Sequence, residues 1–330
     1  MSVDATIVAV GDVAFQQMPA AATLTACSEW SARWRDAGPC GVFGNLELPL
    51  TSRGTPADKP VALRGPPDGA GALRSMGFDL VSLANNHALD YGPQGLRDTM
   101  AALDAAGVTH VGAGVGKQAY RAEIRTLGGA RVAFVAFSST LPRGWAAAVD
   151  RLGVAPLRVH QSVYLDGALQ DEQPGTALKV STWPDEPDLR RAADVVEGLK
   201  REGCDLVIAA LHWGVPPMWL APYQGALADY QRPMAERLIH AGCDAIVGHH
   251  AHVPLPHEFV DGVPVCYSLG NFYFPPFALE HPQEGPITPG LMEAPPPPDL
   301  GHGTAAVFRI HHRTIASVEV IERPTWPERG

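Results

Sequence analysis

The segment SLANNHALDYG, residues 82–92, joins an apolar run to an amphipathic one. FDLVSLA, which overlaps its start, is typical of a buried strand, and GLRDTMAALDAAG after it has helical periodicity. The polar residues therefore lie where a strand ends and a helix is about to begin, and in open α/β sheets that edge is where ligands bind. In isolation the segment is also typical of a polar turn in which Asn85 or Asn86 bonds its own backbone.

The composition is that of a folded α/β chain. The 330 residues are 46% hydrophobic, which is ample for one large domain or two smaller ones. A net charge of −10 without a basic cluster argues against a nucleic-acid partner. The five cysteines form no C-x-x-C pair and are expected to be small buried residues. No apolar run of about eighteen residues occurs, so we expect no membrane anchor and a cytoplasmic location.

Short apolar runs alternate with helical patterns along the chain, which predicts α/β layering. Helices are expected over residues 20–36, 66–76, 93–106, 188–201 and 227–241. The expected strands are ATIVAVGD, CGVFGNLE, FDLVSLA, VTHVGAG, ARVAFVAFS, CDLVIAALHWG, CDAIVGHHAHV, VPVCYSLGNFYF, TAAVFRIHH and IASVEVIE. The adjacent strands at the C-terminal end favour a mixed sheet or two packed sheets.

Two segments interrupt this alternation. Residues 141–187 have scattered proline, glycine and charge, and we expect an irregular insert there. Residues 275–300 are rich in proline, which forbids helix and central strand. Because a strand pattern resumes afterwards, a rigid lid loop is favoured over a linker.

Polar side chains recur directly after several of the predicted strands. Besides the segment at 82–92 they are Asp12, Glu47, His212, His249, His250 and His252. One such place is typical of a turn, whereas five of them indicate one rim of one sheet. Carboxylates, an amide oxygen and imidazoles without a thiolate suit manganese, iron, zinc or a similar divalent ion. The sequence therefore predicts a metal centre at this rim.

The motifs are also those of a known family. In order along the chain they are GDV (11–13), NLE (45–47), VSLANNHALDYGPQGLRDT (81–99), GAG (112–114), LHWG (211–214), GHHAHV (248–253) and YSLGNFYF (267–274). With them the sequence resembles the CapA family of poly-γ-glutamate capsule-synthesis proteins, a branch of the calcineurin-like metallophosphatase superfamily. The resemblance implies one metallophosphatase-fold domain over residues 1–330, built as a four-layer α-β-β-α sandwich with metals at the strand ends.

The resemblance also implies a set of metal ligands. They are Asp12, Glu47, Asn86, His212, His252 and one of His249 and His250. Glu47 takes the place of the carboxylate that bridges two metals, and the H-x-H spacing favours His250 with His252. One or two divalent ions are implied, with manganese preferred over iron, zinc or calcium. The superfamily's first motif is D-x-H, but here Ala14 stands in the histidine position, so one tightly held ion is the firmer expectation.

Further residues are candidates for catalysis or substrate binding. The resemblance makes His87 the general acid/base and lets Asp90 orient it. His302, between two glycines in GHGTAAV, is a candidate second acid/base group. The segment HWGVPPMWLAPY places Trp213, Trp219 and Tyr223 after His212, where they form either core or an apolar wall for a bulky substrate.

Three functions remain open from the sequence. The first is hydrolysis of a peptide or γ-glutamyl-type substrate by metal-activated water, with His87 protonating the leaving group. The second is epimerisation of a peptide residue, with precedent in CapA-like proteins that act on lasso-peptide precursors, in which His87 and His302 exchange a Cα proton. The third is a non-catalytic, metal-stabilised protein of polymer assembly. Hydrolysis is favoured over epimerisation, and both over binding alone, because a purely structural site needs no free imidazole.

Overall fold

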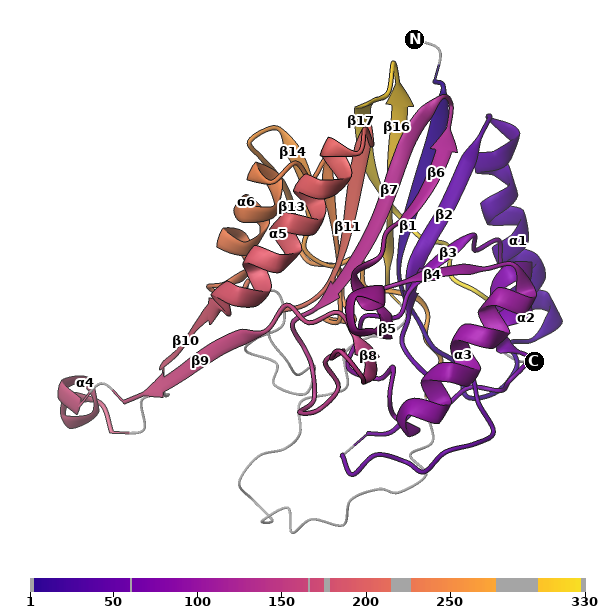
Figure 1. The fold of residues 1–330 in the computed structure, drawn as a ribbon. Coiled ribbons are helices and arrows are strands. Elements are labelled where there is room, and N and C mark those ends of the chain that lie inside the picture. Colours follow the sequence, from indigo (N-terminus) through magenta and orange to yellow (C-terminus); the bar gives the residue numbers. More distant parts are fainter. Residues whose placement is uncertain are drawn as a thin grey trace.

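The computed structural model describes residues 3–59, 61–165, 167–174, 179–214, 227–276 and 302–327. Two large β-sheets pack face to face, and helices cover the outer face of each (Figure 1). The layers therefore run helix, sheet, sheet, helix, which confirms the predicted α/β four-layer α-β-β-α sandwich. None of the described helices is both long and apolar enough to cross a membrane.

The first sheet has the strand order β17-β16-β1-β2-β3-β4, and β15 pairs with the end of β1. Strands β1 to β4 are parallel, whereas β16 and β17 are antiparallel additions at one edge. The bounds are β1 (Ala5–Val13), β2 (Cys40–Leu46), β3 (Leu80–Ser82), β4 (Thr109–Val111), β15 (Asn271–Tyr273), β16 (Thr304–His311) and β17 (Thr314–Glu322).

The second sheet has the order β13-β14-β12-β11-β7-β6, with four parallel central strands and an antiparallel strand at each edge. Its bounds are β6 (Glu123–Leu127), β7 (Ala130–Ser138), β11 (Leu206–His212), β12 (Ala245–His249), β13 (His257–Val260) and β14 (Val263–Cys266). Two small two-stranded sheets are formed by β5 (Ala113–Val115) with β8 (Leu152–Val154), and by β9 (Val159–Tyr164) with β10 (Lys179–Pro184).

The helices divide between the two outer faces. On the first sheet lie α1 (Ala21–Asp36), α2 (Gly69–Ser75) and α3 (Gly92–Ala106), and on the second lie α5 (Glu186–Arg201) and α6 (Gln231–His240). The side chain of Asp185 caps α5 by accepting a hydrogen bond from the amide of Asp188. A short 3₁₀ helix η1 (Gly116–Tyr120) and α4 (Gly167–Glu172) complete the elements. Each helix predicted from the sequence is therefore present.

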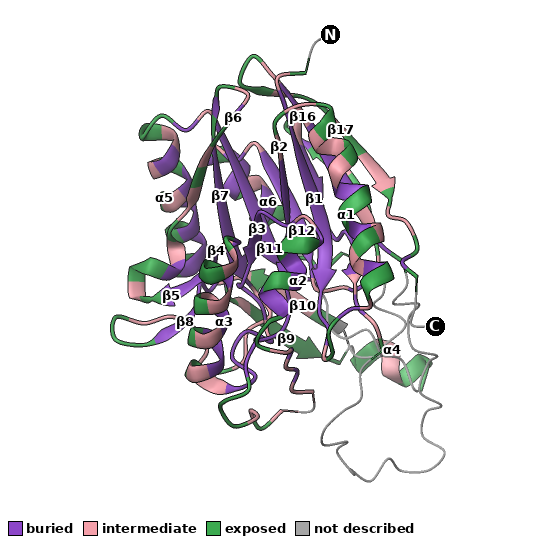
Figure 2. Ribbon diagram, turned by 90° about the vertical axis from the view of Figure 1, so that its right-hand side faces the viewer, coloured by how far each residue is buried: buried purple, intermediate pink, exposed green. Residues whose placement is uncertain are grey.

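The core is deepest between the two sheets. Phe43 from the first sheet packs against Phe134 from the second, in an apolar cluster that also holds Ile7, Ile208 and Val247. Figure 2 shows these central strands buried while the outer helices alternate between buried and exposed residues. Parallel strands covered on both faces have continuous apolar runs, which explains why the sequence identified them.

The predicted irregular insert at 141–187 is wrong in part. It contains β8, β9, β10 and α4, and β9 pairs with β10 as a hairpin. After Val159 every residue of β9 is exposed. The strand therefore lacks the apolar alternation by which a half-buried strand is predicted from sequence. Of the predicted lid at 275–300, residues 277–300 lie outside the described part of the chain.

The carboxyl ends of β1, β2, β11 and β12 come together at one edge of the sandwich. In the first sheet Asp12 is in register with Asn45 on β2 and with Asn271 on β15. In the second sheet His212 is in register with His249. The strands approach so closely here that a Cβ on Gly11 would overlap the carbonyl of Gly270, which explains the glycine of the GDV motif.

Candidate metal centre

Side chains from both sheets meet at this edge. Asp12 and Glu47 come from β1 and the residue after β2, and His212, His250 and His252 come from the end of β11 and the segment after β12. They form two donor groups, Glu47 with His212 and His250, and Asp12 with Glu47 and His252. Within each group one ligand atom of every residue lies within 4.8 Å of the others. The structure therefore places five of the predicted ligands in one cluster, with Glu47 shared by both groups.

The shared carboxylate of Glu47 has an unsatisfied oxygen. Its Oε1 lies 3.4 Å from His212 Nε2 and 3.5 Å from His252 Nε2, and Glu47 is fully buried. Within the described residues this oxygen has no hydrogen-bond partner, and the same holds for the buried Nδ1 of His250. A buried polar atom without a partner costs free energy, about 1–3 kcal/mol. A cation between these donors removes that cost, so the residues fit a divalent ion.

The two asparagines of the opening segment have separate positions. Asn86 Oδ1 lies 2.7 Å from His212 Nε2, which places its amide oxygen at the cluster. Asn85 instead holds the turn, because its Nδ2 donates to the carbonyl of Leu46 at 2.7 Å and its Oδ1 accepts from the amide of His87 at 3.0 Å. Of the two interpretations of this segment, the polar turn therefore applies to Asn85 and the metal ligand to Asn86.

Asp12 and His252 are held in place by neighbours that the sequence did not single out. Asn45 Nδ2 donates to Asp12 Oδ1 at 2.8 Å, and Asn271 Oδ1 lies 2.9 Å from His252 Nδ1. The amide of His250 donates to Asp12 Oδ2 at 3.0 Å. His250 and His252 have positive φ angles of 97° and 57°, a backbone conformation that residues other than glycine seldom adopt. Such strain persists where the surroundings require it, and here it turns both imidazoles into the cluster.

His249 lies apart from both donor groups. Its Nε2 lies 3.1 Å from the carbonyl oxygen of Val10, and its ring packs edge-on against Phe43 between the sheets. His250 is the member of the pair that faces Glu47 and His212. The structure thus places the His250 alternative at the cluster.

Burial keeps most of the imidazoles neutral. It lowers the pKa of His212 to about 3 and the pKa of His250 well below its ordinary value. Burial also lowers the pKa of His252, but the carboxylates of Glu47 and Asp12 outweigh it and raise that pKa. Burial, reinforced by Glu47, raises the pKa of Asp12. Neutral imidazoles are the form that binds metal, so His212 and His250 are ready for an ion without losing a proton.

The chemistry of the donor set limits the choice of ion. Carboxylate and imidazole donors without a thiolate suit manganese, iron or zinc. Ala14, where the superfamily has a histidine, is fully buried and offers no donor. The group of Asp12, Glu47 and His252 therefore has one imidazole. The group of Glu47, His212 and His250 has two.

His87 forms a buried pair with Asp90 beside the cluster. His87 Nδ1 lies 2.6 Å from Asp90 Oδ2, the contact that the sequence interpretation anticipated. Asp90 is fully buried and also accepts from the amide of Leu63 at 2.6 Å. The same Nδ1 lies 3.3 Å from Lys59 Nζ, so Asp90 and Lys59 hold this side of the ring. Donation from Nδ1 to the carboxylate leaves Nε2 for a substrate.

Lys59 is a member of this site that the sequence reasoning missed. Its Nζ lies 2.6 Å from Asp90 Oδ1, donates to the carbonyl of Asn86 at 2.6 Å, and lies 4.9 Å from the ring centre of Trp145. Burial lowers the pKa of the Lys59 ammonium, although Asp90 acts to raise it. No periodicity or motif marks this position, so its role is visible only in three dimensions.

A pocket of about 270 Å³ is lined in part by Trp145, the residue whose ring Lys59 approaches. It is lined by Thr55, Ala57, Leu89, Gly92, Pro93, Arg143, Gly144, Trp145, Arg151 and Leu152. Two arginines and the first turn of α3 give it a positive character, since a helix N-terminus carries partial positive charge. The pocket is therefore suited to anionic groups.

The predicted aromatic wall after His212 is wrong for Trp213. Trp213 is fully buried, stacks on Tyr267 and donates from Nε1 to the Tyr267 carbonyl at 3.0 Å. Successive residues of a strand point to opposite faces, so the residue after His212 faces the helix layer. Trp219 and Tyr223 lie outside the described residues. The side chain of His302 is exposed, and its carbonyl accepts from the amide of Asn271 at 3.2 Å, which leaves its catalytic role a prediction.

Comparison with known proteins places this chain in a family. The family model described as bacterial capsule synthesis protein PGA_cap matches residues 6–276. The chain belongs to this family. The resemblance to the CapA family is thereby confirmed, and every residue of the two donor groups lies within the matched range of the PGA_cap model.

Several curated relatives share the family. A protein named probable polyglutamine synthesis accessory protein, from Mycobacterium tuberculosis, is 38% identical over 233 residues, covering 69% of this chain and 53% of the relative. The PGA biosynthesis protein CapA of Bacillus subtilis is 30% identical over 237 residues, covering 71% and 53%. The capsule biosynthesis protein CapA of Bacillus anthracis is 30% identical over 239 residues, covering 71% and 50%. The chain spans about half the length of these relatives.

Proposed function

We propose that this PGA_cap protein is a metal-dependent enzyme that hydrolyses a peptide or γ-glutamyl-type substrate. The observation that carries the proposal is the buried Oε1 of Glu47, shared by two donor groups and without a hydrogen-bond partner among the described residues. Beside it, His87 and Asp90 form a pair that belongs to neither group. A site that only bound metal for stability would need the donors but not this pair.

The ion would be held by Glu47, His212 and His250, with the oxygen of Asn86 close by, and a second by Asp12, Glu47 and His252. A divalent ion there, with manganese preferred over iron, zinc or calcium, supplies Lewis-acid polarisation of a carbonyl and acidifies a water molecule.

The pair of His87 and Asp90 manages the proton. With the Nδ1 proton of His87 directed at Asp90, Nε2 is the atom that takes a proton from the attacking water and then passes it to the leaving amine. The positive charge that the imidazole carries between these two transfers is stabilised by Asp90, which lies 2.6 Å away. Lys59 balances the charge of Asp90 while the imidazole is neutral, because its ammonium contacts the other carboxylate oxygen.

The substrate class rests on the pocket and on the names of the relatives. A γ-linked glutamate chain carries one free carboxylate on every residue, and Arg143 and Arg151 line the pocket that also contains Trp145. The relatives are named for polyglutamine synthesis and for PGA or capsule biosynthesis. The pocket suits an anionic substrate, and the names of the relatives favour an acidic peptide-like chain among such substrates.

Epimerisation of a peptide residue is the alternative. It requires a second acid/base group, and the carbonyl of His302 bonds the amide of Asn271, whose side chain contacts His252. The backbone of His302 thus lies at the rim of the same cluster. A metal-stabilised assembly protein without turnover ranks third.

One experiment separates the three functions. The metal-loaded protein is incubated in deuterium oxide with γ-linked glutamate oligomers and with α-linked peptides, and the products are analysed by mass spectrometry. Shortened chains support hydrolysis, and an intact chain one mass unit heavier supports epimerisation. If every substrate stays intact and unlabelled, both hydrolysis and epimerisation are contradicted. The variant His87→Gln is assayed in parallel, and its matched control is His240→Gln, which changes an exposed histidine that lies 3.0 Å from Asp261.

A further inference from the structure

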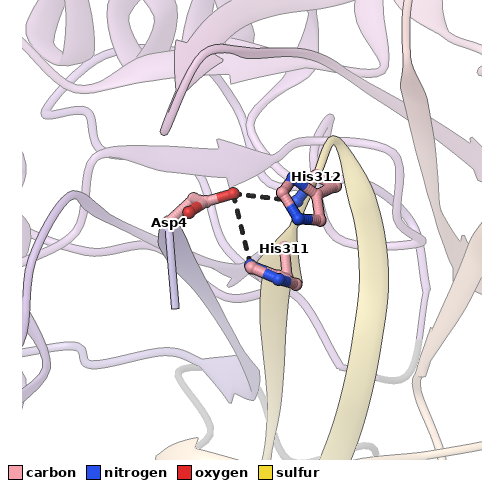
Figure 3. Close-up of side chains that lie close together, drawn as sticks. All are labelled: Asp4, His311 and His312. Atoms are coloured by element: carbon pink, nitrogen blue, oxygen red, sulfur yellow. Dashed lines mark hydrogen bonds and ion pairs between the residues drawn. The ribbon is translucent and has the colours of Figure 1, made fainter. Parts of the chain in front are cut away.

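A third group of metal-type donors lies at the opposite end of the first sheet. Asp4 precedes β1, His311 ends β16, and His312 begins the turn into β17 (Figure 3). One ligand atom from each of the three lies within 4.8 Å of the others. Asp4 and Asp12 are eight residues apart along β1, so this group is roughly 26 Å from the centre described above. It also lies outside the range matched by the PGA_cap model.

The strand pairing fixes these residues side by side. β1 and β16 are antiparallel with Ala5 opposite Ile310, and the amide of Asp4 donates to the Ile310 carbonyl at 2.9 Å. The amide of His312 donates to Asp4 Oδ2 at 2.8 Å. The carboxylate of Asp4 is therefore held by backbone contacts, and its position does not depend on either imidazole.

His311 has an unused nitrogen directed at this carboxylate. Its Nδ1 lies 3.6 Å from Asp4 Oδ2, which is too long for a hydrogen bond. The atom is buried and lacks a hydrogen-bond partner among the residues that the structure describes, although the His311 side chain as a whole is 24% exposed. A buried, unpaired nitrogen facing a carboxylate is the arrangement that a shared cation would satisfy.

The turn brings the two imidazoles together. His312 and Arg313 have φ of 48° and 63°, as in the two-residue hairpin turns that usually contain Asn-Gly. Adjacent strand residues normally point to opposite faces, but here the ring centres of His311 and His312 are 3.9 Å apart. The cation of Arg313 is directed elsewhere, with Nη1 3.8 Å from Asp205 Oδ1.

We propose that Asp4, His311 and His312 form a second, surface metal site that takes a borderline divalent ion such as Zn²⁺ or Ni²⁺. Two imidazoles and one carboxylate are the donors that zinc uses in open three-ligand sites, with solvent in the remaining positions. An ion bound there joins the start of β1 to the β16–β17 hairpin. It therefore stabilises the edge of the first sheet, whatever reaction the main centre performs.

Zinc binding to the whole chain tests the proposal. Equilibrium dialysis against Zn²⁺, followed by metal analysis, gives the number of ions per chain for wild type, His311→Gln and His312→Asn. Asparagine tolerates positive φ, so His312→Asn keeps the turn and removes only the imidazole. We expect each variant to bind one zinc ion fewer than wild type and to lose part of the zinc-induced rise in Tm. His240→Gln is the matched control and should bind as wild type does.

The surface site is separable from the main centre by the variant Glu47→Gln. Glu47→Gln leaves the surface site intact, because Asp4, His311 and His312 lie at the other end of the sheet. Adding His312→Asn to Glu47→Gln should therefore still remove one zinc ion. Equal zinc binding by wild type, His311→Gln and His312→Asn would overturn the proposal. A loss of the same size in His240→Gln would also overturn it, since binding would then be a general property of exposed histidines.

Discussion

Asp90 Oδ2 lies 2.6 Å from His87 Nδ1, and both residues are buried at the edge of the metal cluster. The contact fixes the ring orientation of His87, and it directs Nε2 away from the carboxylate. His87 is also close enough to influence His212 and His250 electrostatically. An imidazole in this position can exchange protons with a substrate without being a ligand.

Replacing His87 by glutamine should separate metal binding from turnover. The donor groups do not include His87, so we expect the metal content of His87→Gln to equal that of wild type. Turnover should fall about 10²- to 10⁴-fold, the usual contribution of a general acid or base. Metal analysis and the mass-spectrometric assay measure the two effects on the same sample. Full turnover in His87→Gln would remove His87 from the mechanism.

Lys59 should be coupled energetically to Asp90. In Lys59→Met the fully buried carboxylate loses its counter-charge, and breaking a buried pair in this way costs about 3–5 kcal/mol of unfolding free energy. The double variant Lys59→Met/Asp90→Asn leaves no buried charge, so it should be less destabilised than Lys59→Met alone. Urea unfolding measures both, and the exposed Lys117→Met is the control. Additive effects of the two substitutions would show that the pair is not coupled.

The two adjacent histidines should respond differently to substitution. His250→Gly tolerates the φ of 97° and removes a donor, so we expect bound metal to be lost. His249→Leu should keep the metal, but it leaves the Val10 carbonyl without its partner and costs about 1–3 kcal/mol of stability. Metal analysis together with thermal unfolding distinguishes the two variants. Metal loss in His249→Leu with retention in His250→Gly would reverse the assignment.

Metal affinity should rise with pH because protons compete for His252 and Asp12, whose pKa values are both raised. Glu47 and Asp12 raise the pKa of His252 above 6.5, so below that pKa this imidazole carries a proton that an ion must displace. Burial lowers the pKa of His212 to about 3, so His212 adds no competition near neutrality. Calorimetry in buffers of different ionisation enthalpy should detect protons released on ion binding at slightly acidic pH. Binding without proton release would contradict this electrostatic account.

Much of the fold was predictable because its central strands are buried on both faces. Such strands appear in the sequence as continuous apolar runs, and the helices between them have clear periodicity. The hairpin of β9 and β10 could not be found in this way, because β9 is exposed on both faces and has no apolar alternation. The sequence left Trp213 as either core or a substrate wall, and only the structure shows that it is core, on the side of the strand opposite His212.

The site was predictable only where its residues follow strands. Asp12 and His212 lie in the last residues of a strand, Glu47, His250 and His252 come just after one, and these strand ends meet at one edge. Lys59 has no such signal, since it lies in an irregular segment. It reaches Asp90 through long-range contacts, among them the hydrogen bond from the amide of Ala57 to the Asp90 carbonyl at 2.7 Å.

The most direct measurement is the metal content of Glu47→Gln beside wild type. Glu47 is the carboxylate shared by both donor groups, and glutamine keeps its size while removing the charge. The control is Glu236→Gln, in which the replaced carboxylate belongs to neither donor group and pairs with Arg232. After loading with manganese and removal of free metal, we predict that wild type and Glu236→Gln retain the ion and that Glu47→Gln does not. If Glu47→Gln retained as much manganese as wild type and Glu236→Gln, the claim that Glu47 joins these donors into one metal centre would be contradicted.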